Sequence, residues 1–498
     1  MNFLYLIKFL IFNKEKYKTK NSKQKILVEV FDYKADYITY SIFSNTLAEI
    51  YNAELIAYYP TFLSIKKKII IIIKRIFLIN ILEKVFFSFG CLKVLEPSRN
   101  DNIIKFKKIK SKKDLLNFKF KGVLLGDLIY DGFLREKNQI TVNINSDEFK
   151  KYFANALNLT NFWLAYLNKT QVKAMMQSHN VYLLGIPGRV ACSLNIDVYN
   201  VSCYETYFLN KKKPLKWNYF DDFPKDFRAL PKKIKTQGLL KAKKLLNKRI
   251  RGKKDILINK SEKIIGGTFE KKVTYSFKFS KKPKILIAAH HFNDAPHVHK
   301  DMLFEDFYEW MHFIGKISDK YDYYQWLVKL HPVDYEGNIN SMNNIIKNYK
   351  NLDLLDNNIN HNILKKQNIL GVLTVYGSIA HEYPFFNIPV INAGNNPHVG
   401  YNFSYNPKNK KEYTKLIDNI YNLKKFKKDK NKIYEFYFMN FMLDFNLFEK
   451  LKFNEKVLDS NEIFKYFFQK KMSKNLESYS KLYKNFIKSK SRRMYKNL

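Results

Sequence analysis

Two runs of alternating strand-like and helix-like segments, separated by a lysine-dense stretch, constrain the fold of this chain most. In the first run, apolar segments such as KILVEVF at residues 25–31 and AELIAYY at residues 53–59 alternate with a segment of helical spacing. Short strands that alternate with helices are typical of βαβ units, whose strands lie parallel in one sheet. At 498 residues the chain is also too long for a single core. We therefore predict two α/β domains.

The two runs divide the chain into four predicted regions. The first run contains further strands at VKAMMQSH and IDVYNVS, and FKGVLLGDLIYDGFLRE predicts a strand that ends at Gly126-Asp127. The second run contains KILIAA, QWLVKL, ILGVLTV and IPVINAG between residues 284 and 394. We predict a Rossmann-like domain at 1–204, a basic helical connector at 205–282, a second Rossmann-like domain at 283–429 and a helical basic tail at 430–498.

Polar side chains directly follow several of these strands. KILIAA runs into His290 and His291, QWLVKL contains Lys329 and precedes His331, ILGVLTV precedes Gly377 and Ser378, and strands of the first domain end at Asp127 and His179. In open parallel sheets, ligands bind beyond the carboxyl ends of the strands. The pattern therefore predicts a binding cleft between two facing domains.

VYGSIAHEYPFFNIPVINAG, at residues 375–394, is the most specific signal in the chain. Gly377 allows a close turn of the backbone, and Ser378 precedes a predicted helix whose free N–H groups favour an anion. Glu382 follows one turn later on the same face, where a carboxylate can accept hydrogen bonds from ribose hydroxyls. The alternative is an ordinary capped helix with a solvated glutamate.

Four of the ten histidines lie in the loop HHFNDAPHVH, at His290, His291, His297 and His299. Histidine and aspartate are common zinc and manganese ligands. The loop contains neither HExxH nor HxHxDH, however, and no other acidic loop completes a two-metal site, so we predict no metal. We expect His291 or His297 to meet phosphate or acceptor hydroxyls in the cleft, with Asp294 orienting a ring. Plain surface histidines are the alternative.

The motifs of the second half resemble the donor-binding half of GT-B glycosyltransferases. VKLHP and, further downstream, GSIAHEYPFFNIPVIN are similar to elements of the enzymes that build capsules and surface polysaccharides. The longer pattern over residues 284–407 resembles an uncharacterised surface-polysaccharide subgroup, and LLGDLIYDGFLRE and SHNVYLLGIPGRVA extend the likeness into the first half. Ile379 after Ser378 departs from the Ser-Ser or Ser-Thr pair of some relatives.

The resemblance implies a transferase whose substrate is a nucleotide-activated sugar and which needs neither a cofactor nor a metal. Lys329 and His331 would contact the donor phosphate, Gly377, Ser378 and the helix they open would hold the same phosphate, and Glu382 would bind ribose or the donor sugar. The first domain would hold the acceptor, a growing surface glycan or a lipid-linked sugar. Helix dipoles and basic side chains would stabilise the departing nucleotide.

An inverting transferase also needs a base that takes the proton of the acceptor hydroxyl. Asp127, Asp131 and His179 in the first domain are candidates, and we favour Asp127 or His179. The loop residue His291 is a further candidate catalytic group. For His179, the alternative is a hydrogen-bonded core histidine.

The formal net charge of +43 predicts anionic partners. No zinc-finger spacing, RNP-like strand or arginine-rich arm accompanies the charge, so we predict no nucleic acid and favour an anionic membrane surface. The three cysteines show no paired spacing, which fits a reduced compartment. We therefore predict a cytoplasmic protein that is peripheral at the inner face of the membrane.

Two apolar stretches bear on that prediction. MNFLYLIKFLIF lacks a basic n-region and a small-residue cleavage site, so we predict a short amphipathic helix, packed or lying on a membrane, and no signal peptide. IIIIIKRIFLINIL, at residues 69–82, contains Lys74 and Arg75 and is too short to span a bilayer. We predict a core helix there, with a membrane-surface helix as the alternative.

Three other functions are compatible with the same residues. A metal-dependent hydrolase could use the histidine loop at residues 290–299, and bound metal would favour it. A non-catalytic partner of polysaccharide export would bind no nucleotide. A nucleotide-sugar epimerase of the same fold would differ only in its product.

Overall fold

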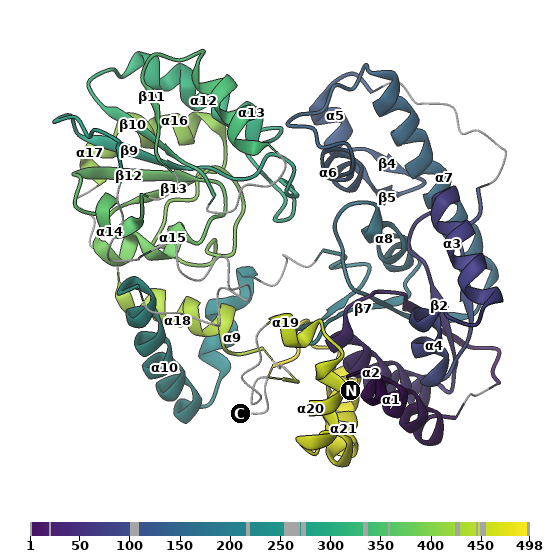
Figure 1. The fold of residues 1–498 in the computed structure, drawn as a ribbon. Helices are drawn as coiled ribbons and strands as arrows, with labels where there is room; N and C mark the ends of the chain where they lie inside the picture. The colour runs from purple at the N-terminus through teal and green to yellow at the C-terminus, as the bar shows by residue number, and fades with distance from the viewer. Residues whose placement is uncertain are drawn as a thin grey trace.

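The computed structural model describes residues 2–18, 21–99, 109–215, 220–252, 269, 275–331, 337–356, 359–423, 429–444, 447–448 and 455–495. Within them the chain forms two open α/β sheets, each packed on both faces by hydrophobic side chains (Figure 1). The predicted α/β class with two Rossmann-like domains is confirmed.

The first sheet has the strand order β3-β2-β1-β6-β7-β8. The strands are β1 (Lys25–Glu29), β2 (Glu54–Tyr58), β3 (Cys91–Leu95), β6 (Val172–Gln177), β7 (Asp197–Val201) and β8 (Thr206–Leu209). All pair in parallel except β8, which lies antiparallel to β7. The order reverses between β1 and β6, so the carboxyl ends of these strands form the switch point at which such sheets bind ligands.

The second sheet repeats this plan with the order β11-β10-β9-β12-β13, and all its strands are parallel. The strands are β9 (Lys284–Ala288), β10 (Gln325–Lys329), β11 (Leu352–Leu354), β12 (Ile369–Thr374) and β13 (Val390–Asn392). Its switch point lies between β9 and β12. The sequence did not predict β3, β8 or β11, all of which are edge strands. In β3 and β11 a single residue is buried, which leaves little apolar pattern to detect.

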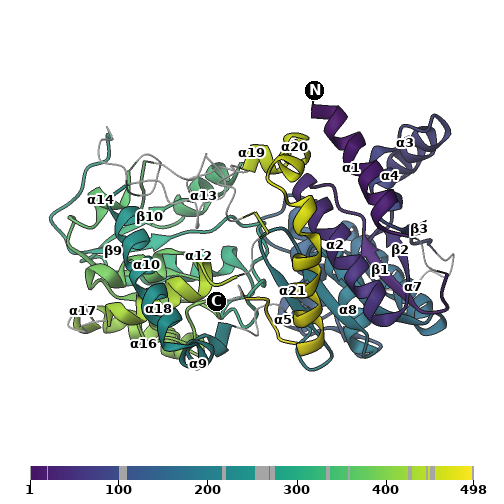
Figure 2. The ribbon, with the colours of Figure 1, turned by 90° about the horizontal axis from the view of Figure 1, so that it is seen from below.

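Helices cover both faces of each sheet (Figures 1 and 2). One face of the first sheet carries α1 (Asn2–Lys16), α2 (Lys34–Tyr51), α4 (Ile81–Ser88), α20 (Glu462–Gln469) and α21 (Leu476–Ser489), and the other carries α5 (Lys112–Leu116), α6 (Gly126–Glu136), α7 (Asp147–Lys169), η1 (Leu183–Gly185) and α8 (Ile186–Ser193). The second sheet lies between α12 (Phe307–Lys320), α13 (Asn338–Ile346), α16 (Lys410–Asp418) and α17 (Ile420–Leu423) on one side and α14 (His361–Leu364), α15 (Ile379–Glu382) and η3 (Pro384–Phe386) on the other.

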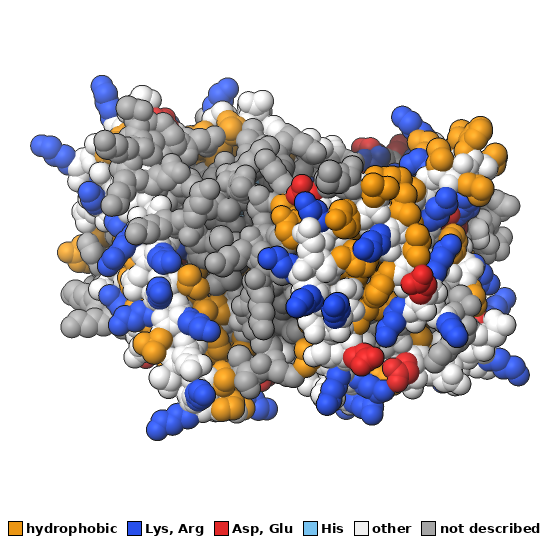
Figure 3. All heavy atoms as spheres, turned by 60° about the horizontal axis from the view of Figure 1, so that its bottom comes forward, with side chains coloured by type: hydrophobic (Ala, Val, Ile, Leu, Met, Phe, Trp, Pro, Cys, Tyr) orange, Lys and Arg blue, Asp and Glu red, His pale blue; other side chains and the backbone are white. Residues whose placement is uncertain are grey.

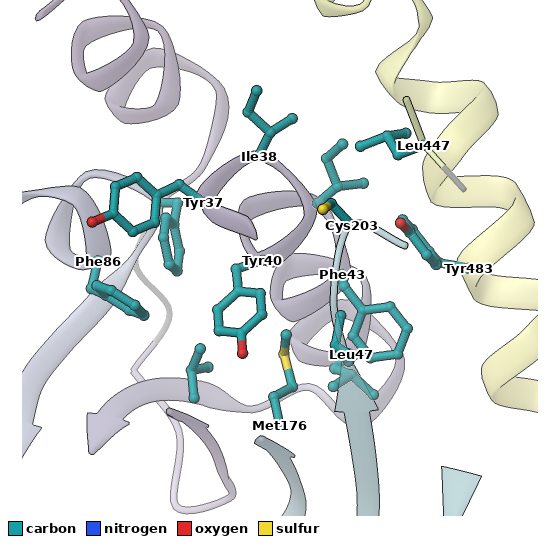
Figure 4. Close-up of a cluster of buried hydrophobic side chains, with 14 of the residues drawn as sticks. Tyr37, Ile38, Tyr40, Phe43, Leu47, Phe86, Met176, Cys203, Leu447 and Tyr483 are labelled. Carbon is teal, nitrogen blue, oxygen red and sulfur yellow. The ribbon is translucent and has the colours of Figure 1, made fainter. Parts of the chain in front are cut away.

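The C-terminal helices complete the core of the first domain. Figure 4 shows Tyr483 of α21 and Leu447 beside Phe43 and Cys203, in the cluster built around α2. Together with α19 (Glu455–Leu458) and η5 (Ser473–Asn475), α20 and α21 pack on α1 and α2. The predicted tail at 430–498 contains these helices, and aromatic residues of α20 and α21 cover a face of the first sheet.

The connector is helical, as predicted, but its limits differ. Strand β8 lies inside the predicted connector yet belongs to the first sheet. The helices α9 (Phe223–Ala229) and α10 (Lys232–Ile250) follow, and α18 (Lys430–Phe441), from the predicted tail, packs on both. The remainder of the connector, residues 253–268 and 270–274, lies outside the described residues.

The strand predicted to end at Gly126-Asp127 is wrong. A short hairpin, β4 (Lys119–Phe120) with β5 (Val123–Leu124), precedes α6, which begins at Gly126. A Cβ atom at Gly126 would lie 1.8 Å from the Leu115 carbonyl oxygen, so only glycine fits this close approach. The apolar run continues at helical spacing through Ile129 and Phe133, which face the core.

The stretch at residues 69–82 is not a core helix. It forms most of α3 (Ile65–Ile76) and the turn into α4, and no residue of α3 is buried. Helix α1 has the predicted amphipathic character, with Leu6 and Phe9 in the core and Phe3 and Leu4 exposed. The three cysteines are buried and form no disulfide. None of the helices described above is long and apolar enough to cross a membrane.

Candidate functional site

A cavity of about 520 Å³ lies at the switch point of the first sheet. It is lined by residues that follow β1 (Phe31, Tyr33, Asp36), β6 (Ser178, His179, Asn180, Val181) and β7 (Asn200, Ser202, Tyr204, Glu205), and by Phe220, Val298 and His299. Val298 and His299 belong to the loop that follows β9, so both domains contribute to the cavity, as the strand-end pattern predicted. Its size falls in the range of small-molecule sites, roughly 300–1,000 Å³.

Glu29, Ser178 and His179 form a hydrogen-bonded chain beside this cavity. The hydroxyl oxygen of Ser178 lies 2.9 Å from Glu29 Oε1 and 2.7 Å from His179 Nδ1, and the backbone N–H of Ser178 donates to Glu29 Oε2. An ionised carboxylate only accepts, so the Ser178 hydroxyl then donates to Glu29 and accepts from His179 Nδ1–H. This tautomer places the lone pair of the imidazole on Nε2.

Burial raises the pKa of Glu29 to about 7, because the carboxyl is 1% exposed and the hydrogen bonds from Ser178 offset only part of the loss of water. The group therefore titrates near neutral pH. Sequence reasoning placed His179 at a strand end facing the cleft, which the cavity lining confirms. It missed Glu29 and Ser178, although a lone carboxylate inside the apolar strand KILVEVF is a signal that points to Glu29.

Asp127 does not stand at a strand end. It lies in the first turn of α6, where both carboxylate oxygens accept from Arg189 of α8, at 2.9 and 3.1 Å. Both side chains are buried. Both oxygens of this carboxylate are therefore occupied by one guanidinium in a bidentate ion pair. Of the candidate bases in the first domain, the geometry therefore favours His179 over Asp127.

The carboxyl ends of β9 and β10 bring His291 and His331 together, with Nε2 of His291 3.1 Å from Nδ1 of His331. His291 is buried, whereas His331 is half-buried. Their proximity follows from the parallel register of the strands and matches the strand-end pattern. Pro332, the second residue of the HP element, lies outside the described residues. Contact of His331 with a phosphate stays a prediction.

His290 connects the ends of two strands and is partly exposed. Its ring stacks on Phe307 with centroids 4.7 Å apart, and Nε2 lies 3.2 Å from Thr374 Oγ1 at the end of β12. Burial, together with the neighbouring histidines, lowers the pKa of His290 to about 3, so the ring is neutral. His290 thus lies in the loop after β9, and its contact with a ligand stays a prediction.

His297 joins the two domains. Its Nδ1 lies 2.5 Å from Asp131 Oδ1, its backbone N–H donates to Asp131 Oδ2, and Nε2 lies 3.1 Å from the Glu305 carbonyl oxygen. Burial lowers the pKa of His297, but the charge and hydrogen bond of Asp131 outweigh it and the pKa is raised. Asp131, not Asp294, orients this ring, and Asp294 accepts instead from the Tyr182 hydroxyl. The His297 ring and the Asp131 carboxylate thus form a contact with each other across the two domains.

Two predicted donor-binding side chains are buried. Glu382 is 0% exposed, and its Oε1 accepts from Arg249 Nε of α10 at 2.7 Å. Lys329 Nζ donates to the Ile359 carbonyl oxygen at 2.6 Å, and burial lowers its pKa to about 8. The prediction that these groups face a nucleotide does not match this burial. Sequence reasoning also missed Arg249, because its lysine-dense surroundings resemble a solvated helix.

The segment at Gly377 and Ser378 keeps part of its predicted character. A Cβ atom at Gly377 would lie 2.9 Å from Thr374 Oγ1, so the close turn favours glycine. Ser378 is exposed and its side chain makes no capping hydrogen bond. Helix α15 has only four residues, however, which leaves little helix dipole at its start. Ser378 and Glu382 also do not share an environment, since one is exposed and the other buried.

Within the described part of the chain, no group of three or more His, Cys, Asp or Glu side chains is arranged to hold a metal ion. A second cavity, of about 590 Å³, lies at the amino end of β2 and is lined largely by α1, α2 and α21. Parallel sheets bind ligands at the opposite ends of their strands. The cavity that contains His179 is therefore the candidate site.

No known protein family matches this sequence, and no curated protein matches it either. Several solved structures are similar to the chain at low scores. KpsC, the beta Kdo 2,4 transferase of Thermosulfurimonas dismutans, has a TM-score of 0.32 and 11% identity, over 53% of this chain and 79% of its own. A glycosyltransferase of Rickettsia africae has a TM-score of 0.27 and 12% identity, over 94% and 99%.

The UDP-GlcNAc 2-epimerase of Neisseria meningitidis, solved with UDP-GlcNAc bound, has a TM-score of 0.23 and 10% identity, over 83% of this chain and 97% of its own. Glycosyltransferases and epimerases thus both occur among the similar structures. With TM-scores below 0.5, these similarities transfer neither substrate nor mechanism to the chain.

Proposed function

We propose that the protein is a glycosyltransferase that moves a sugar from a nucleotide-activated donor to a hydroxyl of a surface glycan or lipid-linked acceptor. One observation carries this proposal. A histidine oriented by a serine and a carboxylate lines a cavity that two Rossmann-like domains share. From the second domain, the ring of His299 lines the same cavity and packs on Tyr376, at the end of β12, with centroids 4.8 Å apart. Both switch points therefore lie near one space.

The lining of the cavity suits a carbohydrate acceptor. Phe31, Tyr33, Tyr204 and Phe220 provide aromatic surface, and Asp36 and Glu205 provide carboxylates. Aromatic rings pack against the apolar faces of sugars, while carboxylates accept hydrogen bonds from hydroxyls. We therefore assign the acceptor to the first domain.

In the proposed reaction, His179 Nε2 takes the proton of the acceptor hydroxyl. The acceptor oxygen forms a bond to the anomeric carbon, the bond from that carbon to the donor phosphate oxygen breaks, and the nucleotide leaves with the electron pair. A single displacement of this kind inverts the anomeric configuration. Ser178 and Glu29 act as positioning residues that hold the ring and stabilise the imidazolium as it forms.

On the donor side, we propose that His291, His331 and the Ser378 hydroxyl meet the phosphates. They lie at the carboxyl ends of β9, β10 and β12, and hydrogen-bond donors fixed there stabilise the charge of the departing nucleotide. We propose no metal, cofactor or nucleic acid. The expected setting is the cytoplasmic face of an anionic membrane, where a lipid-linked acceptor is available.

The test measures thermal melting of the full chain with CMP, UDP, GDP, dTDP and CDP, each with and without EDTA. A ligand at 100 times its dissociation constant stabilises a fold by about 2.7 kcal/mol, which a melt detects. We expect one nucleotide to raise the melting temperature regardless of EDTA. His331→Ala should abolish the shift, His179→Ala should keep it but lose sugar transfer, and His312→Ala should change neither. His312 is the matched control, because it bonds to Tyr349 and does not line the cavity.

Each alternative predicts a different result. A metal-dependent hydrolase would show no nucleotide shift and a lower melting temperature in EDTA. For a non-catalytic export partner, neither a nucleotide nor EDTA would change the melting temperature. An epimerase would bind a nucleotide sugar and release its epimer with no acceptor present. Any of these results would overturn the transferase proposal.

A further inference from the structure

Helix α3 exposes several large apolar side chains. Its sequence is IKKKIIIIIKRI, and none of its twelve residues is buried. Ile65 is 80% exposed and Ile76 is 69% exposed, and the turn that follows adds Phe77, Leu78 and Ile79. Soluble proteins rarely expose a contiguous apolar patch of this kind unless another surface covers it.

The helix has a defined apolar side. Ile65, Ile69, Ile72 and Ile76 recur at the spacing that places residues on one face. Lys66 lies on one flank of this row, and Lys68 lies on the other. Both lysines are exposed. An apolar row between basic flanks is the pattern of helices that lie in the plane of a membrane interface.

The opposite side of α3 holds the helix on the first domain. Arg75 forms ion pairs with Glu83 of α4 at 2.7 Å and with Glu96 at 2.6 Å. Ile71 packs against the core, and the Ser64 hydroxyl caps the first turn by accepting from the Lys67 N–H. None of these contacts uses the isoleucine row, and Ile69 and Ile72 in its middle are 52% and 51% exposed.

Helix α1 exposes a second apolar side on the same domain. Its outer side exposes Phe3, Leu4, Ile7 and Ile11. Helix α4 packs on α1, and both ribbon views draw α1, α4 and α3 side by side on the outer part of the first domain. Figure 3 shows apolar side chains interspersed with lysine and arginine over that domain.

We infer that the exposed faces of α3 and α1 form a docking surface for an anionic lipid bilayer. The isoleucine row enters the boundary between headgroups and acyl chains, and the flanking lysines extend their ammonium groups to lipid phosphates. Charge favours lipid over a second copy of this chain, since a two-fold contact would bring like-charged lysines together. The inference names the surface for the membrane partner proposed above but does not depend on sugar transfer.

The test is flotation of the full chain with phosphatidylcholine vesicles, with and without phosphatidylglycerol. We expect binding to the mixed vesicles to be about tenfold or more tighter than to phosphatidylcholine alone. Ile69→Glu/Ile76→Glu should weaken that binding about tenfold or more, since two carboxylates enter the apolar row. The matched control Leu240→Glu/Tyr421→Glu, which changes exposed apolar residues elsewhere, should bind as the parent does.

Equal binding to both vesicle types would overturn the inference, and so would unchanged binding of Ile69→Glu/Ile76→Glu. A third contrary result is a parent chain that does not bind vesicles and sediments as a dimer, with the variant sedimenting as a monomer. The same variant should keep the melting shift with a nucleotide. Loss of vesicle binding is therefore distinguishable from failure of the proposed function.

Discussion

The strand ends of the two sheets occupy equivalent places in the topology but use their polar residues differently. At the end of β6, His179 faces a cavity and is oriented by Ser178 and Glu29. At the end of β9, His290 is packed between rings, and nearby Glu382 is paired with Arg249 from the connector. The polar residues at the strand ends of the first sheet line a cavity. Most of those at the second sheet instead form contacts with other parts of the protein.

This difference shows that a polar side chain at a strand end is not necessarily accessible to a ligand. A strand end predicts that a polar side chain lies near a ligand site. Whether the side chain can contact a ligand depends on its other partners in the protein. In the second sheet, Lys329 donates to a backbone carbonyl oxygen and Glu382 accepts from the Arg249 guanidinium. The comparison predicts that substitutions at the strand ends of the first sheet affect activity, and that substitutions at the buried pair affect stability.

The largest effect is expected at Glu29. In Glu29→Gln, the amide oxygen accepts from the Ser178 N–H and the amide nitrogen donates to Ser178 Oγ, which then donates to His179 Nδ1. The proton of the ring moves to Nε2, so the base is lost and kcat should fall about 10²- to 10⁴-fold with KM little changed. Steady-state kinetics would measure this.

Glu54→Gln is the matched control, because Glu54 lies at the amino end of the neighbouring strand and pairs with Lys25. It should keep full activity. Full activity in Glu29→Gln would show that the chain from Glu29 to His179 does not orient a base, and the contrast between the two sheets would disappear.

The next effect is expected at the buried ion pair of the second domain. Arg249→Ala leaves the Glu382 carboxylate buried without its partner, which should lower the free energy of unfolding by about 3–5 kcal/mol. Arg251→Ala, an exposed neighbour at the end of α10, should change it by less than about 0.5 kcal/mol. Denaturant unfolding would compare the two. Equal losses would mean that the pair does not fix the connector to the sheet.

A third prediction uses pH to sharpen the role of Glu29. Its pKa is raised from the ordinary 4.5 to about 7 in the folded chain, so folding favours the protonated form. The stability from this group is complete below pH 4.5 and is lost as pH rises through 7, by about 3 kcal/mol in total. The parent should therefore lose more stability than Glu29→Gln between pH 5 and 8. Parallel curves for the two chains would contradict the raised pKa.

The smallest effect is expected at Gly377. In Gly377→Ala, the new methyl would lie 2.9 Å from Thr374 Oγ1, so the turn must shift, at a cost of about 1–3 kcal/mol. Thermal unfolding would measure this cost. In contrast, Gly122→Ala has no atom within 4 Å of the new methyl but has a φ of +83°, so its cost would arise from the backbone alone. No loss at Gly377 would mean that the turn before Ser378 adapts freely.

Much of the fold could be predicted from local pattern. The central strands of both sheets are continuous apolar segments, and each was recognisable because a strand buried on both faces carries few polar residues. The pattern also placed His179, His291 and His331 at strand ends that face the cleft. The edge strands β3 and β11 were not predicted, since most of their residues are not buried. The hairpin before α6 was not predicted, because a short apolar run by itself does not distinguish a strand from a helix.

The sequence by itself determined the two sheets, their central strands and the polar residues at their ends, because periodicity is set by neighbours a few positions apart. Only the tertiary structure decided which of those residues face a cavity. Arg249 meets Glu382 across 133 positions, and Asp131 meets His297 across 166. The same holds for α3, whose isoleucines resemble a core helix in sequence but lie on the surface. Burial depends on what covers a residue, and the covering segments come from distant parts of the chain.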